Sequence, residues 1–192
     1  MLRSKKVKSL LLVHNEAGGA GRQMNTGKSL LEQFQGSDGR QHLIDALVSQ
    51  PLVGDRDLAA IVAQRLKLEE VPAGKNLISQ GASDTDLFLI LKGAVSIAVD
   101  GREVARKEAG EHVGEMAVVD PVTPRSASVV ATADSVVARI AEPDFSALAD
   151  RHPRLWRRIA LELASRLRNV STVEHHKSTV EHHSVKAHHR AA

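Results

Sequence analysis

The residues best suited to chemistry lie in one segment from Gly110 to Val130, GEHVGEMAVVDPVTPRSASVV, where Glu115 precedes Arg125 by ten residues. An arginine guanidinium is always charged, and its fork of N–H donors matches phosphate oxygens. An ionised carboxylate only accepts hydrogen bonds, so it can receive a ribose hydroxyl but repels a phosphate. Together the two side chains would orient a nucleotide, with its sugar toward Glu115 and its phosphate toward Arg125.

Small residues surround these two charges. Ala117, Ser126 and Ala127 let backbone N–H groups approach an anion closely, and Ser126 adds a hydroxyl donor. A hydrogen bond to a charged group contributes roughly 1.5–3 kcal/mol, so loss of Arg125 should remove much of the binding. The alternative is that Glu115 and Arg125 form an ordinary surface ion pair without a function. The complete set of residues favours the ligand site.

The segment resembles the phosphate-binding cassette of the cyclic nucleotide-binding domain family, which includes the catabolite activator protein and the regulatory subunit of cAMP-dependent protein kinase. In that family the glutamate binds the ribose 2′-hydroxyl, and the arginine binds the exocyclic phosphate oxygens. The resemblance implies a cyclic nucleoside monophosphate as ligand, with no catalytic residue, no metal and no further cofactor. The site residues that it implies are Gly114, Glu115, Met116, Ala117, Arg125, Ser126 and Ala127. One departure is Val113, where an aromatic residue is frequent in the family.

Between residues 67 and 140, short apolar runs alternate with glycine turns, a pattern typical of a closed or double-sheet antiparallel roll. The dipeptide Asp100-Gly101 between two alternating runs predicts a tight hairpin. The resemblance implies a mixed β and α fold, an eight-stranded antiparallel β-roll of the jelly-roll type flanked by N-terminal and C-terminal helices. The predicted strands are Lys67–Val71, Asn76–Ser79, Asp86–Leu91, Val95–Val99, Arg102–Lys107, Ser126–Ala131 and Ser135–Ile140.

Helical periodicity precedes the strands. Apolar residues at three- and four-residue spacing predict one helix that ends at Pro51, and Asp55 is suited to cap the next. These helices are expected to pack on the domain that follows.

A final helix follows the strands, with an apolar stripe of Leu155, Ile159, Leu163 and Leu167. In the family the corresponding helix closes over the base as a lid and often forms a dimer seam. The residues that could meet the base are Leu163, Ser165, Arg166 and Asn169.

Four segments follow from these patterns. A flexible, basic and glycine-rich segment covers 1–28, N-terminal helices cover 29–54, and a cyclic nucleotide-binding domain with a C-terminal lid helix covers 55–170. A histidine-rich, low-complexity tail covers 171–192; its paired histidines do not define a ligand geometry for a metal. Gly27-Lys28-Ser29 resembles the end of a P-loop, but the glycine required five residues earlier is replaced by Arg22.

The composition excludes several classes of protein. The chain of 192 residues contains no cysteine, which excludes disulfides and thiolate metal sites and favours a cytoplasmic location. No apolar run reaches the length of a membrane span. With a net charge of +3 and four aromatic residues, neither a nucleic-acid footprint nor a stacking platform is indicated.

These observations predict a binding module without catalysis, which senses a cyclic nucleotide such as cAMP and signals by movement of the C-terminal helix. The expected partners are the nucleotide, a second copy of the chain bound through that helix, and an unknown effector domain or protein; nucleic acid and membrane are not expected. Two alternatives stay open. The layout is similar to sensors that precede a TIR domain in bacterial anti-phage effectors responding to cyclic pyrimidine nucleotides. It also fits a catabolite-activator-type transcription regulator that is truncated before its DNA-binding domain. A nucleotide-hydrolysing or metal-dependent enzyme is a remote third hypothesis.

Overall fold

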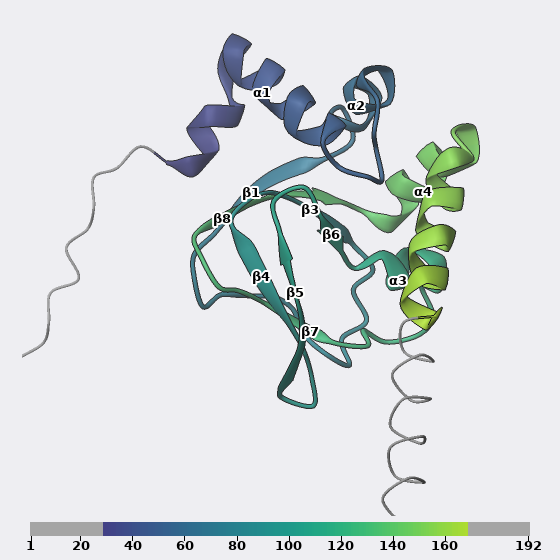
Figure 1. Ribbon diagram of the computed structural model, residues 1–192. Coiled ribbons are helices and arrows are strands. Elements are labelled where there is room, and N and C mark those ends of the chain that lie inside the picture. Colours follow the sequence, from purple (N-terminus) through teal and green to yellow (C-terminus); the bar gives the residue numbers. More distant parts are fainter. Residues whose placement is uncertain (1–28, 169–192) are drawn as a thin grey trace, which may run out of the picture.

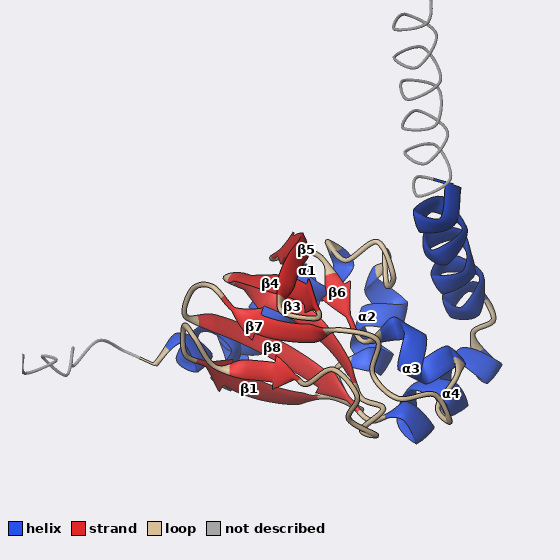
Figure 2. Cartoon of the chain, turned by 90° about the horizontal axis from the view of Figure 1, so that it is seen from below, coloured by secondary structure: helices blue, strands red, loops and turns tan. Residues whose placement is uncertain are grey.

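The computed structural model describes residues 29–168, which form a β-roll with helices gathered mainly at one end (Figures 1 and 2). Two four-stranded antiparallel sheets make up the roll, in the orders β1-β8-β3-β6 and β2-β7-β4-β5. The strands are β1 (Lys67–Val71), β2 (Asn76–Ile78), β3 (Leu87–Lys92), β4 (Ala94–Val99), β5 (Arg102–Glu108), β6 (His112–Val113), β7 (Ser128–Ala131) and β8 (Ser135–Ile140). The helices are η1 (Leu30–Phe34), α1 (Gly36–Val48), α2 (Arg56–Val62), α3 (Glu115–Val119) and α4 (Glu142–Arg151), followed by a C-terminal helix over residues 154–168. The predicted fold class is confirmed.

All seven predicted strands are present within two residues of their expected bounds. The β4–β5 hairpin turns at Asp100 and Gly101, whose φ angles of 50° and 75° are the left-handed values that a tight hairpin requires. Two elements were not predicted. Strand β6 is only two residues long, and helix α3 has five residues, so neither is long enough to show a periodic pattern.

Strands β3 and β8, at the centre of one sheet, are buried on both faces. Leu87, Leu89 and Leu91 of β3 pack into a core shared with the helices, while Phe88 and Ile90 point into the roll. Successive side chains of a strand point to opposite faces, so a strand covered on both sides becomes apolar throughout. This sheet therefore fixes the helices and the interior of the roll relative to each other.

The N-terminal helices pack against that sheet as expected. The side chain of Asp55 accepts a hydrogen bond of 2.8 Å from the backbone N–H of Leu58, which confirms the predicted cap of α2. Asp55 also pairs with Arg154 of the C-terminal helix at 2.7 Å. The N-terminal helices and the C-terminal helix are therefore joined at their ends.

The C-terminal helix packs on the core along only part of its apolar stripe. Leu155 and Ile159 are each 1% exposed, whereas Leu167 is 69% exposed, so the predicted apolar stripe is buried at its first members and exposed at its last. Arg158 of this helix donates hydrogen bonds to the backbone carbonyls of Leu52 and Val53. The helix is thus anchored at its beginning and projects away from the strands at its end (Figure 2).

Within residues 29–168, no helix has the length and apolar character that crossing a membrane requires. The segments predicted for 1–28 and 171–192 lie outside the described residues.

Candidate functional site

Gly114 forms the turn that presents the first site residue. It has a φ of 93° and lies at the N-cap of α3, directly after β6. A Cβ atom at this position would lie 2.6 Å from the backbone oxygen of Asp86 and 2.9 Å from Nη1 of Arg125. Only glycine fits such a close approach at a left-handed φ. The turn places Glu115 at the start of α3, where it is only 3% exposed.

Arg125 is held in place by its backbone as well as its side chain. Its N–H donates to the carbonyl of Ala82, and its carbonyl accepts from Gly81, both at 2.8 Å. The residue is only 6% exposed. Its side chain donates hydrogen bonds to the carboxylate of Asp84 from Nε at 3.0 Å and from Nη2 at 2.5 Å. The loop between β2 and β3 therefore carries the main partner of this arginine.

The remaining bonds of the Arg125 guanidinium point to backbone carbonyls. Nη2 donates to the carbonyl of Asp86 at 2.7 Å, and Nη1 donates to the carbonyl of Gly114 at 3.3 Å. A guanidinium has five N–H donors, so the four bonds to residues 84, 86 and 114 leave one donor on Nη1. That nitrogen lies beside the turn at Gly114, where an anionic ligand would meet it.

The acidic loop that holds Arg125 has its own anchor. Arg139 of β8 bonds to the carboxylate of Asp86 through Nε at 2.5 Å and reaches Glu69 at 3.5 Å. The hydrogen bond with Asp86 raises the pKa of Arg139 above its usual value, against the opposing effect of burial. The loop is thereby fixed to strand β8 of the sheet.

Glu115 pairs with the C-terminal helix and not with Arg125. Its Oε1 accepts a hydrogen bond from Nη1 of Arg166, whose Nη2 donates to Glu162 at 2.5 Å. Burial lowers the pKa of Arg166, but the charges of Glu115 and Glu162 outweigh that effect and raise it. A buried carboxylate needs such a countercharge. The alternative of a simple Glu115–Arg125 surface pair is therefore wrong.

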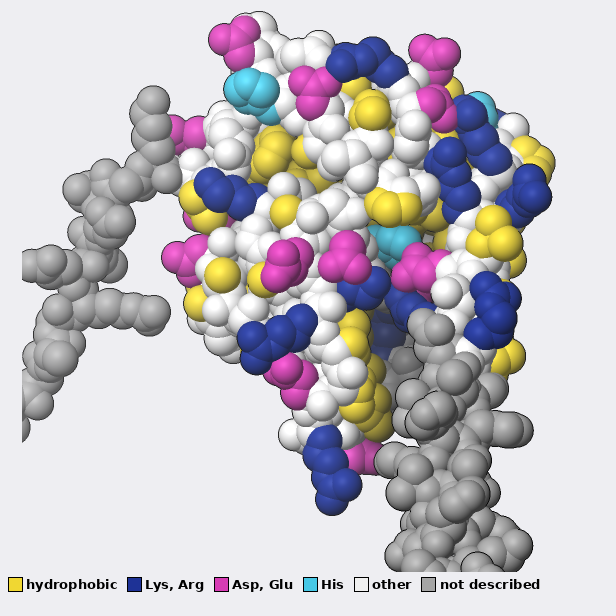
Figure 3. All heavy atoms as spheres, viewed as in Figure 1, with side chains coloured by type: hydrophobic (Ala, Val, Ile, Leu, Met, Phe, Trp, Pro, Cys, Tyr) yellow, Lys and Arg dark blue, Asp and Glu magenta, His cyan; other side chains and the backbone are white. Residues whose placement is uncertain are grey.

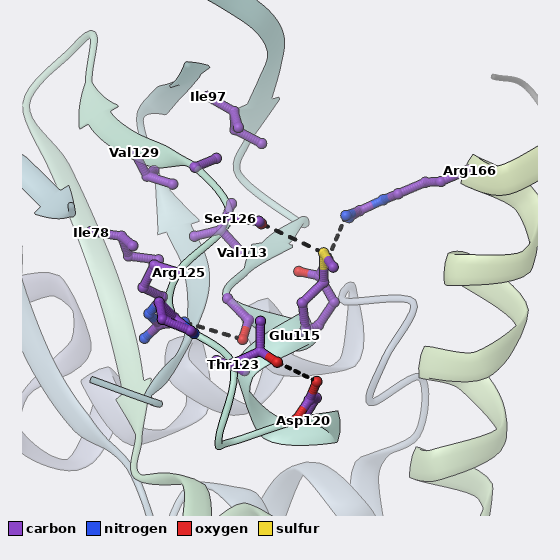
Figure 4. Close-up of a pocket in the computed structure, with 15 residues that line it drawn as sticks. Ile78, Ile97, Val113, Glu115, Asp120, Thr123, Arg125, Ser126, Val129 and Arg166 are labelled. Carbon is purple, nitrogen blue, oxygen red and sulfur yellow. Dashed lines mark hydrogen bonds and ion pairs between the residues drawn. The ribbon is translucent and has the colours of Figure 1, made fainter. Parts of the chain in front are cut away.

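A pocket of about 110 Å³ joins these groups (Figure 4). Arg166 reaches into it from the C-terminal helix, while Arg125 and Glu115 approach from the roll and from α3. The apolar side is formed by Ile78, Ile97, Val113 and Val129. All seven predicted site residues line the pocket, namely Gly114, Glu115, Met116, Ala117, Arg125, Ser126 and Ala127. Their role in binding a ligand stays a prediction.

Of the four helix residues expected near the base, Arg166 alone lines this pocket among the described ones. Ser165 lines a separate cavity, Leu163 packs against the core, and Asn169 lies outside the described residues. Sequence reasoning missed Asp84 and Asp86 altogether. The sequence shows only two aspartates shortly before β3, and this pattern does not indicate which residues the two carboxylates contact.

Glu162 ties the C-terminal helix to the roll. Its Oε2 lies 2.9 Å from Nε2 of His112, and its Oε1 lies 3.6 Å from Nζ of Lys107. Burial raises the pKa of Glu162, but the contacts with His112 and Arg166 outweigh this effect and lower it to about 2. The carboxylate is therefore ionised throughout the neutral range.

We expect the contribution of Glu162 to stability to be lost in acid. Because its pKa falls from 4.5 in the unfolded chain to about 2 in the folded one, the contribution is complete above pH 4.5 and disappears as the pH falls toward 2. The shift corresponds to at most about 3 kcal/mol. Urea unfolding of the wild type and Glu162→Gln should give stabilities that differ at neutral pH and converge in acid. A constant difference across this range would contradict the expectation.

The family model described as "Cyclic nucleotide-binding domain" matches residues 68–152. The chain is 45% identical over 139 residues to the Pycsar effector protein BcPycTIR of Burkholderia cepacia, covering 72% of this chain and 46% of that protein. It is 40% identical over 158 residues to the Pycsar effector protein PaPycTIR of Pseudomonas aeruginosa, covering 81% and 51%. The chain spans about half the length of these curated relatives.

Relatives and structures of regulators match as well. The cAMP-activated global transcriptional regulator CRP of Haemophilus influenzae is 29% identical over 109 residues, covering 54% of this chain and 49% of that protein. Among solved structures, the catabolite activator protein of Thermus thermophilus is 29% identical with a TM-score of 0.62, covering 67% of this chain and 63% of that one. The regulatory domain of Toxoplasma gondii PKA with cAMP shares the fold, with 21% identity, a TM-score of 0.53 and coverage of 60% and 46%. With its β-roll, its cassette and the match over residues 68–152, the chain belongs to the cyclic nucleotide-binding domain family.

Proposed function

We propose that the pocket binds a cyclic nucleoside monophosphate, with the phosphate at Arg125 and the ribose at Glu115. The observation that carries this proposal is that Arg125 and Glu115 are both buried at one pocket without pairing with each other. Arg125 pairs with Asp84, and Glu115 pairs with Arg166. Arg125 offers its remaining Nη1 donor together with backbone amides of small residues, a combination suited to a phosphate monoanion. Glu115 keeps Oε2 as an acceptor for a ribose hydroxyl, because Arg166 bonds to Oε1.

The proposed output is that of a sensor and not of an enzyme. The nucleotide would favour the arrangement in which the C-terminal helix lies against the pocket, because Arg166 of that helix contacts the buried Glu115. Residues 55–170 would act as this ligand-binding unit. No catalytic step is proposed for it, and hydrolysis of the nucleotide by the purified protein would contradict this.

Two settings for the sensor are supported by the comparisons. The identities of 40–45% to Pycsar effectors favour the sensor portion of an anti-phage effector, for which the ligand would be a cyclic pyrimidine nucleotide. The weaker similarity to cAMP-activated CRP favours a regulator of the catabolite-activator type, for which the ligand would be cAMP. The identity of the base separates the two settings.

A homodimer through the C-terminal helix is part of the proposal. Leu161 and Leu167 are 56% and 69% exposed on that helix, and such side chains would be buried in a seam between two copies. Light scattering with and without nucleotide tests the association, and a monomer under both conditions would contradict it.

Calorimetric titration with cAMP, cGMP, cCMP and cUMP tests the central proposal. We expect at least one of the four to bind with micromolar or tighter affinity. A preference for cCMP or cUMP would support the effector setting, and a preference for cAMP the regulator setting. Absence of binding by all four would overturn the proposed function.

A further inference from the structure

A second cavity of about 470 Å³ lies between the C-terminal helix and the roll. Pro51 and Leu52 line it from the connection after α1, His112 lines it from β6, and Leu161 and Glu162 line it from the helix. Figure 3 shows acidic, basic and histidine side chains gathered between the roll and this helix. The cavity is where charged groups of the helix meet charged groups of the roll.

His112 is the buried titratable group of this junction. The residue is 3% exposed, and its Nε2 lies 2.9 Å from Oε2 of Glu162. Protonation of the imidazole adds a positive charge to this contact and strengthens it. The other charged groups facing it are Lys107, Glu111 and Arg158, which line the same cavity. Lys107 bonds to Glu111 at 2.8 Å and lies 3.6 Å from Glu162, farther than the histidine, and Arg158 bonds to backbone carbonyls.

Glu162 connects His112 to the nucleotide pocket through Arg166. One carboxylate oxygen faces His112, and the other accepts a bond of 2.5 Å from Nη2 of Arg166. The second terminal nitrogen of Arg166 donates to Glu115. A planar guanidinium whose two terminal nitrogens both make hydrogen bonds has a fixed orientation. Here that orientation points one terminal nitrogen of Arg166 at the buried carboxylate of Glu115.

We propose that Glu162 is a positioning residue for nucleotide binding, which holds Arg166 on Glu115 and is itself held more firmly when His112 carries a proton. This inference rests on the proposed function of the pocket. The nucleotide binds best to the state in which Arg166 contacts Glu115, since the buried carboxylate then keeps its countercharge while Oε2 receives the ribose hydroxyl. Protonation of His112 stabilises the same state.

The linkage has a defined sign. A protonated His112 attracts the ionised Glu162 more strongly than a neutral one, so the contact weakens when the imidazole loses its proton. Nucleotide affinity therefore falls when His112 loses its proton, and by reciprocity nucleotide binding favours proton uptake.

The test uses the full chain and whichever of cAMP, cGMP, cCMP and cUMP binds most tightly. For the wild type we expect the affinity to fall by about tenfold between pH 6 and pH 8, and calorimetry in two buffers of different ionisation enthalpy to show proton uptake. Glu162→Gln should bind about tenfold more weakly at pH 6, with no pH dependence and no proton uptake. His112→Gln should give a flat profile near the wild-type value at pH 8.

The matched control is Glu103→Gln, which removes an exposed carboxylate that pairs with Arg106 on the β4–β5 hairpin. This variant should keep the wild-type pH profile. A wild-type profile in both Glu162→Gln and His112→Gln would overturn the positioning role, while a loss of binding in Arg125→Ala would still support the proposed function. If Glu162→Gln fails to fold, proton uptake by His112→Gln decides, and uptake equal to that of the wild type overturns the proposal. Absence of binding by every nucleotide removes the proposed function and this inference together.

Discussion

Replacing Arg125 with alanine should lower the affinity for every cyclic nucleotide by about 10- to 100-fold. The remaining Nη1 donor would make one hydrogen bond to the charged phosphate, which contributes roughly 1.5–3 kcal/mol, and about 1.4 kcal/mol is a factor of ten. The effect should be the same for all bases, since the phosphate is common to them. Isothermal titration of the wild type and Arg125→Ala with the four nucleotides measures it.

The structure also defines how this result can be checked against a folding defect. Removing the guanidinium leaves Asp84 without its partner, but the side chain of Asp84 is 44% exposed and can be hydrated. Arg125→Ala should therefore keep its secondary structure, as circular dichroism would show. Arg106→Ala is the control, because Arg106 pairs with Glu103 on an exposed hairpin and does not line the pocket. Unchanged affinity in Arg125→Ala would sink the assignment of the phosphate site.

Replacing Gly114 with alanine should have the second largest effect, on stability and on binding together. A non-glycine residue at a φ of 93° costs about 1–3 kcal/mol. The added Cβ would also lie 2.6 Å from the carbonyl oxygen of Asp86, a rigid backbone atom, and 2.9 Å from Nη1 of Arg125. We expect a total loss of roughly 3 kcal/mol or more in the free energy of unfolding, because the backbone must shift.

Gly110 provides a matched control for this substitution. It has the same φ of 93°, but a Cβ there would have nothing within 4 Å. Gly110→Ala should therefore show only the strain of the left-handed backbone, with nucleotide affinity unchanged. Urea unfolding of both variants measures the loss of stability, and calorimetry measures the loss of nucleotide affinity. The difference between the two variants gives the effect of the steric overlap at Gly114 beyond that of backbone strain. Equal losses in the two variants would show that the close approach at Gly114 has no energetic consequence.

The fold was largely predictable because its signals are local. Glycine turns, the Asp100-Gly101 hairpin and the cap at Asp55 are each encoded within a few residues, and the structure shows all three. The missed elements, β6 and α3, have two and five residues, which is too few for either a strand or a helix pattern to repeat twice. The C-terminal helix was predicted, but the exposure of Leu167 was not, because periodicity does not tell where a helix leaves its support.

The candidate site likewise has features that local sequence predicts and features that depend on contacts between distant residues. The sequence by itself determined that Gly114, Glu115 and Arg125 belong to one site, because all three lie within a single short segment whose residue types suit a sugar and a phosphate. Only the tertiary structure decided that Asp84 holds Arg125 and that Arg166 holds Glu115, pairs that are 41 and 51 residues apart. A buried charge requires a countercharge, but the chain has 26 lysines and arginines and 23 aspartates and glutamates to choose from. The charged residues that pair are decided by the closure of the roll and the path of the final helix. Neither can be predicted from the residues around the site.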